Sequence, residues 1–183
     1  AYLDARQAEH ERYSTANRKA IVARAHELEL AIASHDDATL AHVEEAAEDG
    51  VAISEFPTTL EAASAAHDAG LAILMGAPNV VRGKSHSGNI SATDLVAAGL
   101  LDILSSDYVP FALLQAAFLL PQRVEGLDLS QALATVTRNP ARAAGLNDRG
   151  EIAPGMRADL VRVASNAPLP VVRAVWREGQ RVG

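Results

Sequence analysis

The chain has 183 residues, of which 49% are hydrophobic and only 4% aromatic, and its net charge is −7. This length is sufficient for a buried core, which Ala, Leu, Val and Ile must build. The acidic balance, with no basic stripe, argues against a nucleic-acid partner. The chain has no cysteine, so disulfides and thiolate metal sites are excluded, and His, Asp and Glu are the strong metal ligands that remain. Without a signal peptide or a membrane-spanning apolar run, we expect a cytoplasmic protein with no membrane partner.

Helical segments and short apolar runs alternate along the chain. Residues 4–29 contain no Gly or Pro and are rich in Ala, Arg and Glu, which predicts a long helix. Strands are then predicted at residues 30–36, 51–56, 71–75 and 101–107. Further helices are predicted at residues 37–49, 58–70, 91–99, 109–120 and 129–138, with a polar loop at residues 79–89. A capping box is expected from Thr58 to Glu61.

This order of elements predicts an α/β fold. Near-continuous apolar strands, each followed by a helix, are typical of a parallel sheet. A series of such units forms either a doubly wound sheet or a (βα)8 barrel, and four units make half a barrel. Residues 150–183 differ, because Pro and Gly separate short Val-rich runs, which predicts a small appended β element.

Polar side chains follow the predicted strands, at the edge where parallel α/β folds carry their chemistry. His35, Glu55 and Asp107 each end a different strand. A His, a Glu and an Asp that meet at one edge could hold a divalent metal. The structural alternatives are a hydrogen-bonded His35, a solvated Glu55 and a helix cap formed by Asp36 or Asp37.

Residues 82–89 form a second candidate site, because two cations, a His, two hydroxyls and two glycines lie within eight residues. Such a loop can bind a polyanion through backbone N–H groups and charged donors. A phosphate-binding P-loop is rejected, because Pro78 stands where that motif requires Gly. A solvated loop is the alternative.

Two later segments carry a family resemblance. TRNPAR at residues 137–142 and GEIAPGMRADLV at residues 150–161 resemble the amidohydrolase superfamily, where they follow the last barrel strand and return into a small β-sandwich. Within that superfamily, five further segments resemble the diphosphatases of phosphonate metabolism. These are SHDD at 34–37, EFPTT at 55–59, GAPNVVRG at 76–83, SHSGN at 85–89 and LSSDY at 104–108.

The resemblance implies an incomplete fold. Residues 1–149 would be strands five to eight of a TIM-like (βα)8 barrel, and residues 150–183 the C-terminal strands of the β-sandwich. The N-terminal half of the barrel, with its own metal ligands, would be the partner of this chain. Closure by two copies of the chain, a homodimer, is the alternative.

The resemblance also implies a reaction, the release of pyrophosphate from a ribose 1-alkylphosphonate 5-triphosphate in carbon–phosphorus lyase metabolism. His35 and Asp107 match metal ligands, and Asp107 also matches the general base. Glu55 stands where many members have His, which leaves the metal open among Zn, Mn and Fe. The expected contacts to the phosphorylated substrate are Asn79, Arg82, Lys84, Ser85, His86 and Asn89. The alternatives are a deacetylase of a phosphorylated amino sugar and a catalytically silent assembly module.

Overall fold

The computed structural model describes residues 2–85, 88–165 and 169–183. The chain divides into two compact units, Ala1–Ile32 and Ala33–Gly183. The first unit contains helix α1 (Tyr2–Glu27), which confirms the predicted long helix and buries none of its described side chains. No helix within the described ranges combines the length and the apolar character that crossing a membrane requires.

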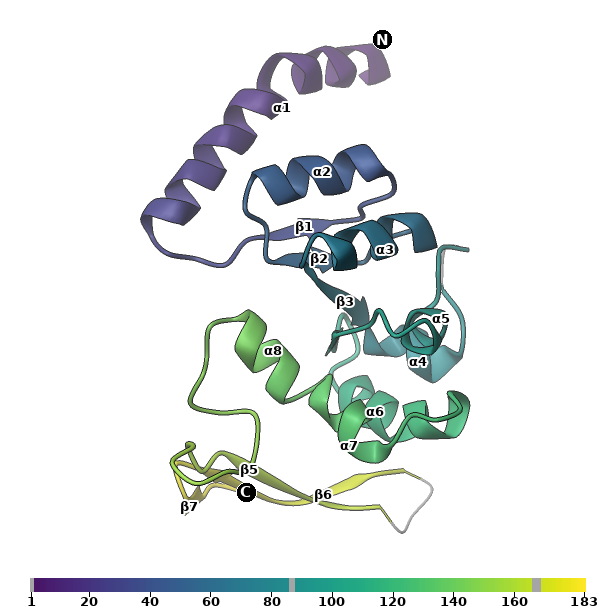
Figure 1. The fold of residues 1–183 in the computed structure, drawn as a ribbon, viewed down its shortest axis with the longest axis vertical. Coiled ribbons are helices and arrows are strands. Elements are labelled where there is room, and N and C mark those ends of the chain that lie inside the picture. Colours follow the sequence, from purple (N-terminus) through teal and green to yellow (C-terminus); the bar gives the residue numbers. More distant parts are fainter. Residues whose placement is uncertain (1, 86–87, 166–168) are drawn as a thin grey trace. The chain divides into compact units, whose positions relative to one another are not determined.

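The second unit begins with a parallel sheet, as predicted (Figure 1). Its strands pair in chain order, β1-β2-β3-β4, without a reversal. His35 is the register partner of Glu55, and Glu55 that of Leu74. The strands are β1 (Ala33–His35), β2 (Ile53–Glu55), β3 (Ala72–Gly76) and β4 (Ile103–Ser105).

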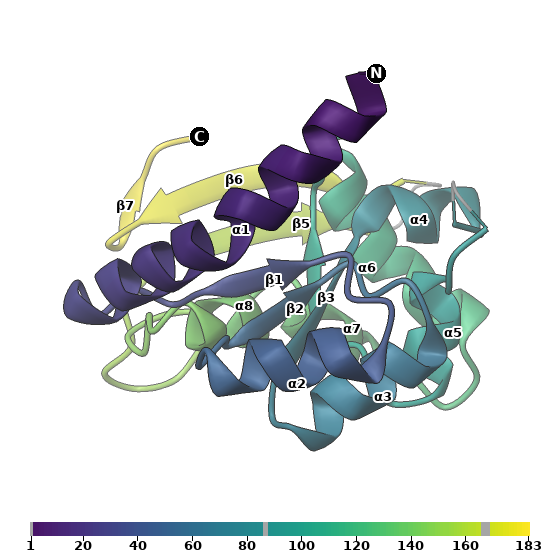
Figure 2. The same ribbon diagram turned by 90° about the horizontal axis from the view of Figure 1, so that it is seen from above.

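The two faces of this sheet are covered unequally. Helices α2 (Leu40–Glu48) and α3 (Leu60–Asp68) lie side by side on one face (Figures 1 and 2). Ser54 and its register partner Ile73 both face the helix-covered side of the sheet and are fully inaccessible to solvent. Leu74 is only half-buried although it is apolar, and its register partner Glu55 projects from the same face of the sheet. We call this second side of the sheet the open face.

Helices α2 and α3 begin at threonine caps. The Thr39 hydroxyl accepts a hydrogen bond from the His42 N–H, and the Thr59 hydroxyl accepts one from the Ala62 N–H. Two predictions are therefore wrong: neither Asp36 nor Asp37 caps α2, and the capping box expected from Thr58 does not form. The Thr58 N–H instead donates to the Asp37 carbonyl at 2.9 Å.

Asp37 is a buried carboxylate that connects two strands. Its side chain is 6% exposed. The hydroxyl of Ser34 on β1 donates to Asp37 Oδ2 at 2.5 Å, and the hydroxyl of Ser54 on β2 donates to the same oxygen at 2.9 Å. Buried polar groups are stable when they are hydrogen-bonded, so this arrangement fixes the ends of β1 and β2 relative to each other.

Five further helices follow in the described chain. The predicted loop at residues 79–89 is partly wrong, because its first residues belong to α4, which has Pro78 in its first turn and ends at Gly83 in the left-handed region (φ 82°). The helix predicted at residues 129–138 is interrupted, because the Thr135 carbonyl accepts from the Leu104 N–H of β4. The helices are α4 (Ala77–Arg82), α5 (Ala92–Ala97), α6 (Ala112–Arg123), α7 (Leu129–Ala134) and α8 (Arg138–Ala143).

The predicted β element near the end of the chain is confirmed. Strands β5 (Leu160–Ala164), β6 (Val171–Arg177) and β7 (Gln180–Arg181) form an antiparallel sheet in the order β5-β6-β7. Much of this sheet is exposed, including Val161 at 56%.

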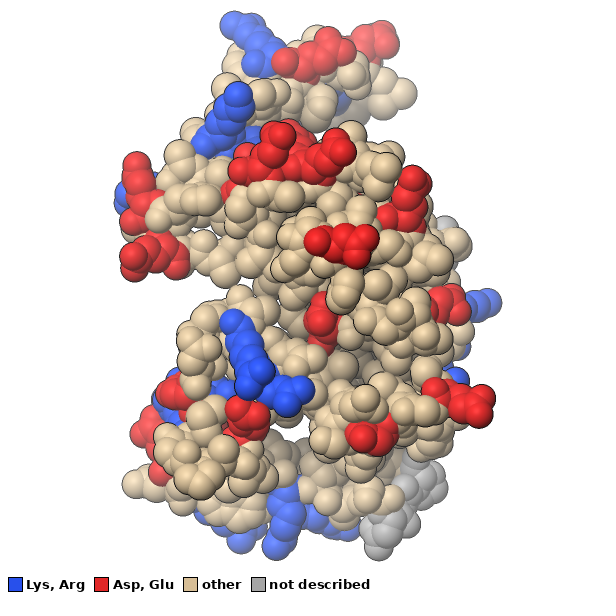
Figure 3. Space-filling model, in the orientation of Figure 1, with Lys and Arg blue, Asp and Glu red and all other residues tan. Residues whose placement is uncertain are grey.

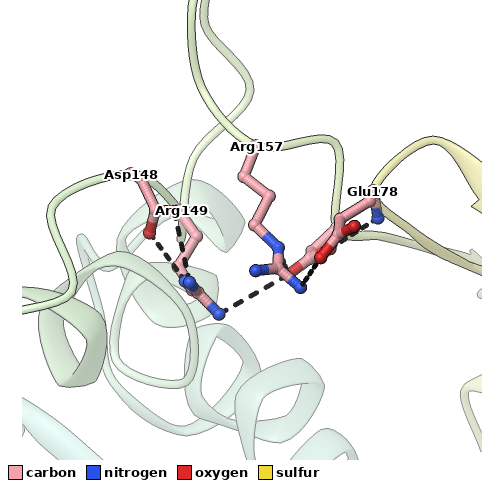
Figure 4. A network of polar contacts seen from close by, with 5 residues as sticks. Asp148, Arg149, Arg157 and Glu178 are labelled. Atoms are coloured by element: carbon pink, nitrogen blue, oxygen red, sulfur yellow. Dashed lines mark hydrogen bonds and ion pairs between the residues drawn. The ribbon is translucent and has the colours of Figure 1, made fainter.

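A network of ion pairs joins the segment after α8 to the small sheet (Figure 4). Arg149 contacts Asp148 at 2.8 Å, and Arg157 contacts Asp159 at 2.8 Å and Glu178 at 2.7 Å. The pKa of the Asp148 carboxyl is lowered from its ordinary 3.8, mainly by the hydrogen bond from Arg149. The pKa of Asp159 is also lowered, mainly because its carboxylate accepts from the Glu178 N–H.

We expect this network to fail in acid. Both carboxyl pKa values are lower in the folded chain, so their stabilising contribution is complete above about pH 4 and is lost as the pH falls through the folded values. Trp176 on β6 is the single tryptophan of the chain, so its fluorescence reports on the small sheet. The double variant Asp148→Asn and Asp159→Asn should lack this acid transition; an unchanged transition would exclude the network as its cause.

Candidate functional site

An open cavity of about 200 Å³ lies at the carboxyl edge of the parallel sheet. It brings together five of the side chains that the sequence singled out, from α4, the following loop and the segment after β4. These predicted residues are Asn79, Arg82, Ser85, Asn89 and Asp107. Other lining residues, for which no role in the site was predicted from the sequence, include Asp36, Phe56, Met75, Gly76 and Tyr108.

Backbone strain is concentrated at this cavity. Asp36 (φ 60°), Phe56 (φ 54°) and Asp107 (φ 50°) all line it and all adopt the left-handed region without being glycine. Such a conformation costs on the order of 1–3 kcal/mol per residue, and it recurs at functional sites because it redirects a side chain. For an aromatic residue such as Phe56 it is a clear outlier. The strain therefore marks the same sheet edge that the cavity occupies.

Asp107 lies directly beside Gly76 at the end of β3. A Cβ atom placed on Gly76 would lie 3.1 Å from Asp107 Oδ2 and 3.4 Å from Phe56 Cε1. The Asp107 carboxylate is exposed, and no described residue donates a hydrogen bond to it. Gly76 thus leaves space for an acidic group that is available to a ligand.

His35 ends β1 on the open face and contacts two cavity-lining residues. Its Nδ1 lies 3.0 Å from Asp36 Oδ2, and its ring meets the Phe56 ring edge-on with centroids 5.2 Å apart. A carboxylate that holds one imidazole nitrogen leaves the other available as a metal ligand. Since Phe56 also approaches Gly76, its ring lies against both His35 and the surroundings of Asp107.

The structure does not assemble the predicted three-ligand site. His35 and Glu55 are adjacent in register, but neither lines the cavity that contains Asp107. Among the described residues, no three His, Asp or Glu side chains are close enough to hold a metal ion. The donors suit a divalent metal chemically, and a complete site needs ligands beyond those that the described chain brings together.

Helix α4 positions two of the predicted substrate contacts. The Asn79 side-chain oxygen accepts from the Ala92 N–H at 3.0 Å, so its amide N–H groups remain as donors. Arg123 on α6 donates to the carbonyl oxygens of Val80 and Val81 at the end of α4. The Val80 carbonyl also accepts from the Gly83 N–H at 3.0 Å, so the guanidinium adds a second donor there and fixes the end of α4 next to Arg82.

The remaining predicted contacts divide into three cases. Ser85 and Asn89 line the cavity, whereas Lys84 is exposed and does not. His86 lies outside the described residues.

Positive charge is scarce around the cavity. The sequence contains no Lys or Arg between Arg24 and Arg82, and acidic side chains gather over α2 (Figure 3). Of the described residues that line the cavity, Arg82 alone is a Lys or Arg. Arg82 is therefore the main attraction for an anionic ligand at this edge.

Comparisons with known proteins agree on one family. The model of the amidohydrolase family matches residues 1–182. The chain is 51% identical over 172 residues to the alpha-D-ribose 1-methylphosphonate 5-triphosphate diphosphatase of Escherichia coli (strain K12). That match covers 93% of this chain and 46% of the relative.

Solved structures show a similar fold at low sequence identity. An uncharacterized protein matches with a TM-score of 0.66 and 19% identity, over 89% of this chain and 48% of its own. The ochratoxinase of A. niger matches with a TM-score of 0.64 and 18% identity, over 88% of this chain and 44% of its own. The chain spans less than half the length of each of these relatives.

Proposed function

Because the chain belongs to the amidohydrolase family, we propose that it contributes one half of a metal-dependent hydrolase that releases pyrophosphate from a ribose 1-alkylphosphonate 5-triphosphate. The observation that carries this proposal is the cavity in which Asp107 and Arg82 both take part. The E. coli relative, a diphosphatase by name, supports the substrate class.

We propose that residues 1–149 form half of a (βα)8 barrel and that residues 150–183 belong to a small β-sandwich. Unreversed strand order supports a barrel, since a doubly wound sheet reverses its order at a switch point. The half-buried apolar open face and the outer edges of β1 and β4, beside which the described residues form no further strand, support a missing partner. The remainder of the family fold is the partner we favour, and a second copy of the chain is the alternative.

The proposed reaction cleaves the anhydride bond between the α- and β-phosphates. A water oxygen forms a bond to the phosphorus nearest the ribose, and the bridging oxygen leaves with the β- and γ-phosphates as pyrophosphate. Asp107 accepts a proton from the water, because its carboxylate is exposed in the cavity without a described hydrogen-bond partner. Arg82 neutralises charge on the leaving phosphates, with donors from Asn79, Ser85 and Asn89.

A divalent ion (Zn, Mn or Fe) would need ligands from the partner half, which would join His35, Glu55 and Asp107 at this edge, because the described chain alone does not bring these three side chains together. When bound, such an ion supplies positive charge that polarises the phosphoryl group and lowers the pKa of water. Within this chain, Asp36 orients His35 for that role through the 3.0 Å contact to Nδ1.

The proposal is tested by product analysis. The chain is joined to the part of the E. coli diphosphatase that it does not cover, and the purified protein is given ribose 1-methylphosphonate 5-triphosphate with divalent metal. We expect one pyrophosphate per substrate and no orthophosphate. Release of acetate from a phosphorylated N-acetyl amino sugar, without pyrophosphate release, would assign the chain to the deacetylases instead. No turnover of either substrate in a folded, metal-loaded protein would favour a silent module.

We expect Gly76→Ala to lower the rate of pyrophosphate release by about 10- to 100-fold, because small displacements of a catalytic group are costly. The new methyl group would lie 3.1 Å from Asp107 Oδ2 and 3.3 Å from Asp107 Cβ, so the exposed Asp107 must shift by a few tenths of an ångström to relieve both contacts. The backbone of Gly76 (φ −77°, ψ 130°) is open to alanine, so the melting temperature should stay close to that of the original chain. Steady-state rates and thermal unfolding check this, and an unchanged rate would exclude the proposed importance of the Gly76 contact.

A further inference from the structure

Tyr108 is a cavity-lining residue to which nothing above assigns a function. It directly follows Asp107, and both are placed by the turn in which the Val109 N–H donates to the Ser106 carbonyl at 3.0 Å. The residue is 62% exposed, so burial in a core does not account for this aromatic side chain. The contacts of Tyr108 instead support a role for its side chain at the cavity.

The phenol of Tyr108 holds the guanidinium of Arg82. Arg82 Nη1 donates to the Tyr108 hydroxyl at 2.7 Å. The Arg82 Cζ atom is 5.9 Å from the ring centroid, near the limit of a cation–π contact, so the hydrogen bond carries the interaction.

The pair unites two separate elements at one cavity. Arg82 ends α4, Tyr108 follows β4, and 26 positions of sequence separate them. A superficially similar pair on α1, Arg6 and Tyr2, lies one helical turn apart, where the helix itself brings the side chains together. An exposed Arg contact adds little to stability, so the long-range pair is better explained by ligand binding than by folding.

The donor pattern specifies the ligand. Arg82 lines the cavity and supplies both N–H donors and positive charge there. Phosphate oxygens accept several such bonds at once, and Arg binds them in a fixed planar geometry. Holding the flexible guanidinium in place beforehand reduces the ordering cost of binding.

We propose that Tyr108 is a positioning residue that orients Arg82 for the polyphosphate group of the substrate, and thereby selects polyphosphorylated substrates. This inference rests on the proposed function for the substrate class, but the contact itself concerns anion binding and can be tested without catalysis.

The test measures binding of inorganic tripolyphosphate to the full chain by titration calorimetry. We expect Tyr108→Phe, which keeps the ring and removes the acceptor, to raise the dissociation constant about five-fold. Arg82→Gln should raise it by more than about ten-fold. Adding Tyr108→Phe to Arg82→Gln should change nothing further, since the phenol acts through Arg82.

Tyr2→Phe is the matched control, because it removes the phenol of the Arg–Tyr pair on α1 and should leave binding unchanged. A five-fold loss that persists in the Arg82→Gln background would overturn the positioning role, as would unchanged binding by Tyr108→Phe or no binding by the original chain. In the joined enzyme, Tyr108→Phe should raise KM and leave kcat nearly constant. Coupled binding without pyrophosphate release would uphold this inference and contradict the proposed reaction.

Discussion

Asp107→Asn is expected to lower the rate of pyrophosphate release by about 10²- to 10⁴-fold, the range associated with loss of a general base. The substitution keeps the size and shape of the side chain and removes its capacity to accept a proton. No described residue donates a hydrogen bond to this exposed carboxylate, so the fold does not depend on its charge. The melting temperature should therefore be unchanged. Steady-state kinetics of the joined enzyme, together with thermal unfolding, measure both quantities.

Asp68→Asn provides the control for this experiment. Asp68 is an exposed carboxylate at the end of α3 that does not line the cavity, and its replacement makes the same change in net charge. Its activity should match that of the original enzyme. If Asp107→Asn also retains full activity, Asp107 does not take the proton, and the base must come from another group at the cavity.

The positions of helices and strands followed from local signals in the sequence. Gly50, Gly70 and Gly99 lie at or just beyond the ends of the helices predicted at residues 37–49, 58–70 and 91–99, and all three adopt left-handed backbone (φ 68°, 83° and 72°) directly after the C-cap residue. This conformation is open to glycine and unfavourable for other residues, so the signal is physical and local. The strand pairing could also be predicted, because consecutive βα units form neighbouring parallel strands.

Errors arose where a distant contact decided the local structure. The chain leaves the helix near Thr135 because its carbonyl pairs with Leu104, which lies about thirty residues earlier in the sequence. Asp37 looked like a helix cap, but the hydroxyls of Ser34 and Ser54 hold it between two strands instead. Neither partner could be identified from the residues that surround Thr135 or Asp37.

The sequence was sufficient to predict which edge of the sheet carries the site, but not which side chains contact one another there. The rule that chemistry gathers at the carboxyl ends of parallel strands pointed to Asp107, and the structure adds Arg82 to the same cavity, although the sequence had placed it in a separate candidate site. It gave no sign that the Phe56 ring would lie against His35, because the left-handed backbone at Phe56 sends the ring there. The contact of Tyr108 with Arg82 was equally hidden, although Tyr108 directly follows Asp107.

The second large effect is expected at Gly150, where the two family-specific segments of the sequence meet. A Cβ atom on Gly150 would lie 2.8 Å from the Cα of Arg138 and 3.0 Å from the carbonyl oxygen of Thr137. Both are backbone atoms at the start of α8, so they cannot move aside as a flexible side chain could. Gly150 also has φ +98°, which an L-amino acid rarely adopts. At this close approach the two segments pack directly against each other.

We therefore expect Gly150→Ala to lower the free energy of unfolding by about 2–5 kcal/mol, the sum of a strained backbone and an overpacked contact. Gly145→Ala isolates the first of these terms, because Gly145 has φ +74° and a Cβ atom placed on it would meet no other part of the fold within 4 Å. That variant should lose only about 1–2 kcal/mol. Urea unfolding followed by circular dichroism measures both variants. If the two substitutions cost the same, the backbone conformation alone accounts for the effect, and the contact between Gly150 and the start of α8 contributes nothing to stability.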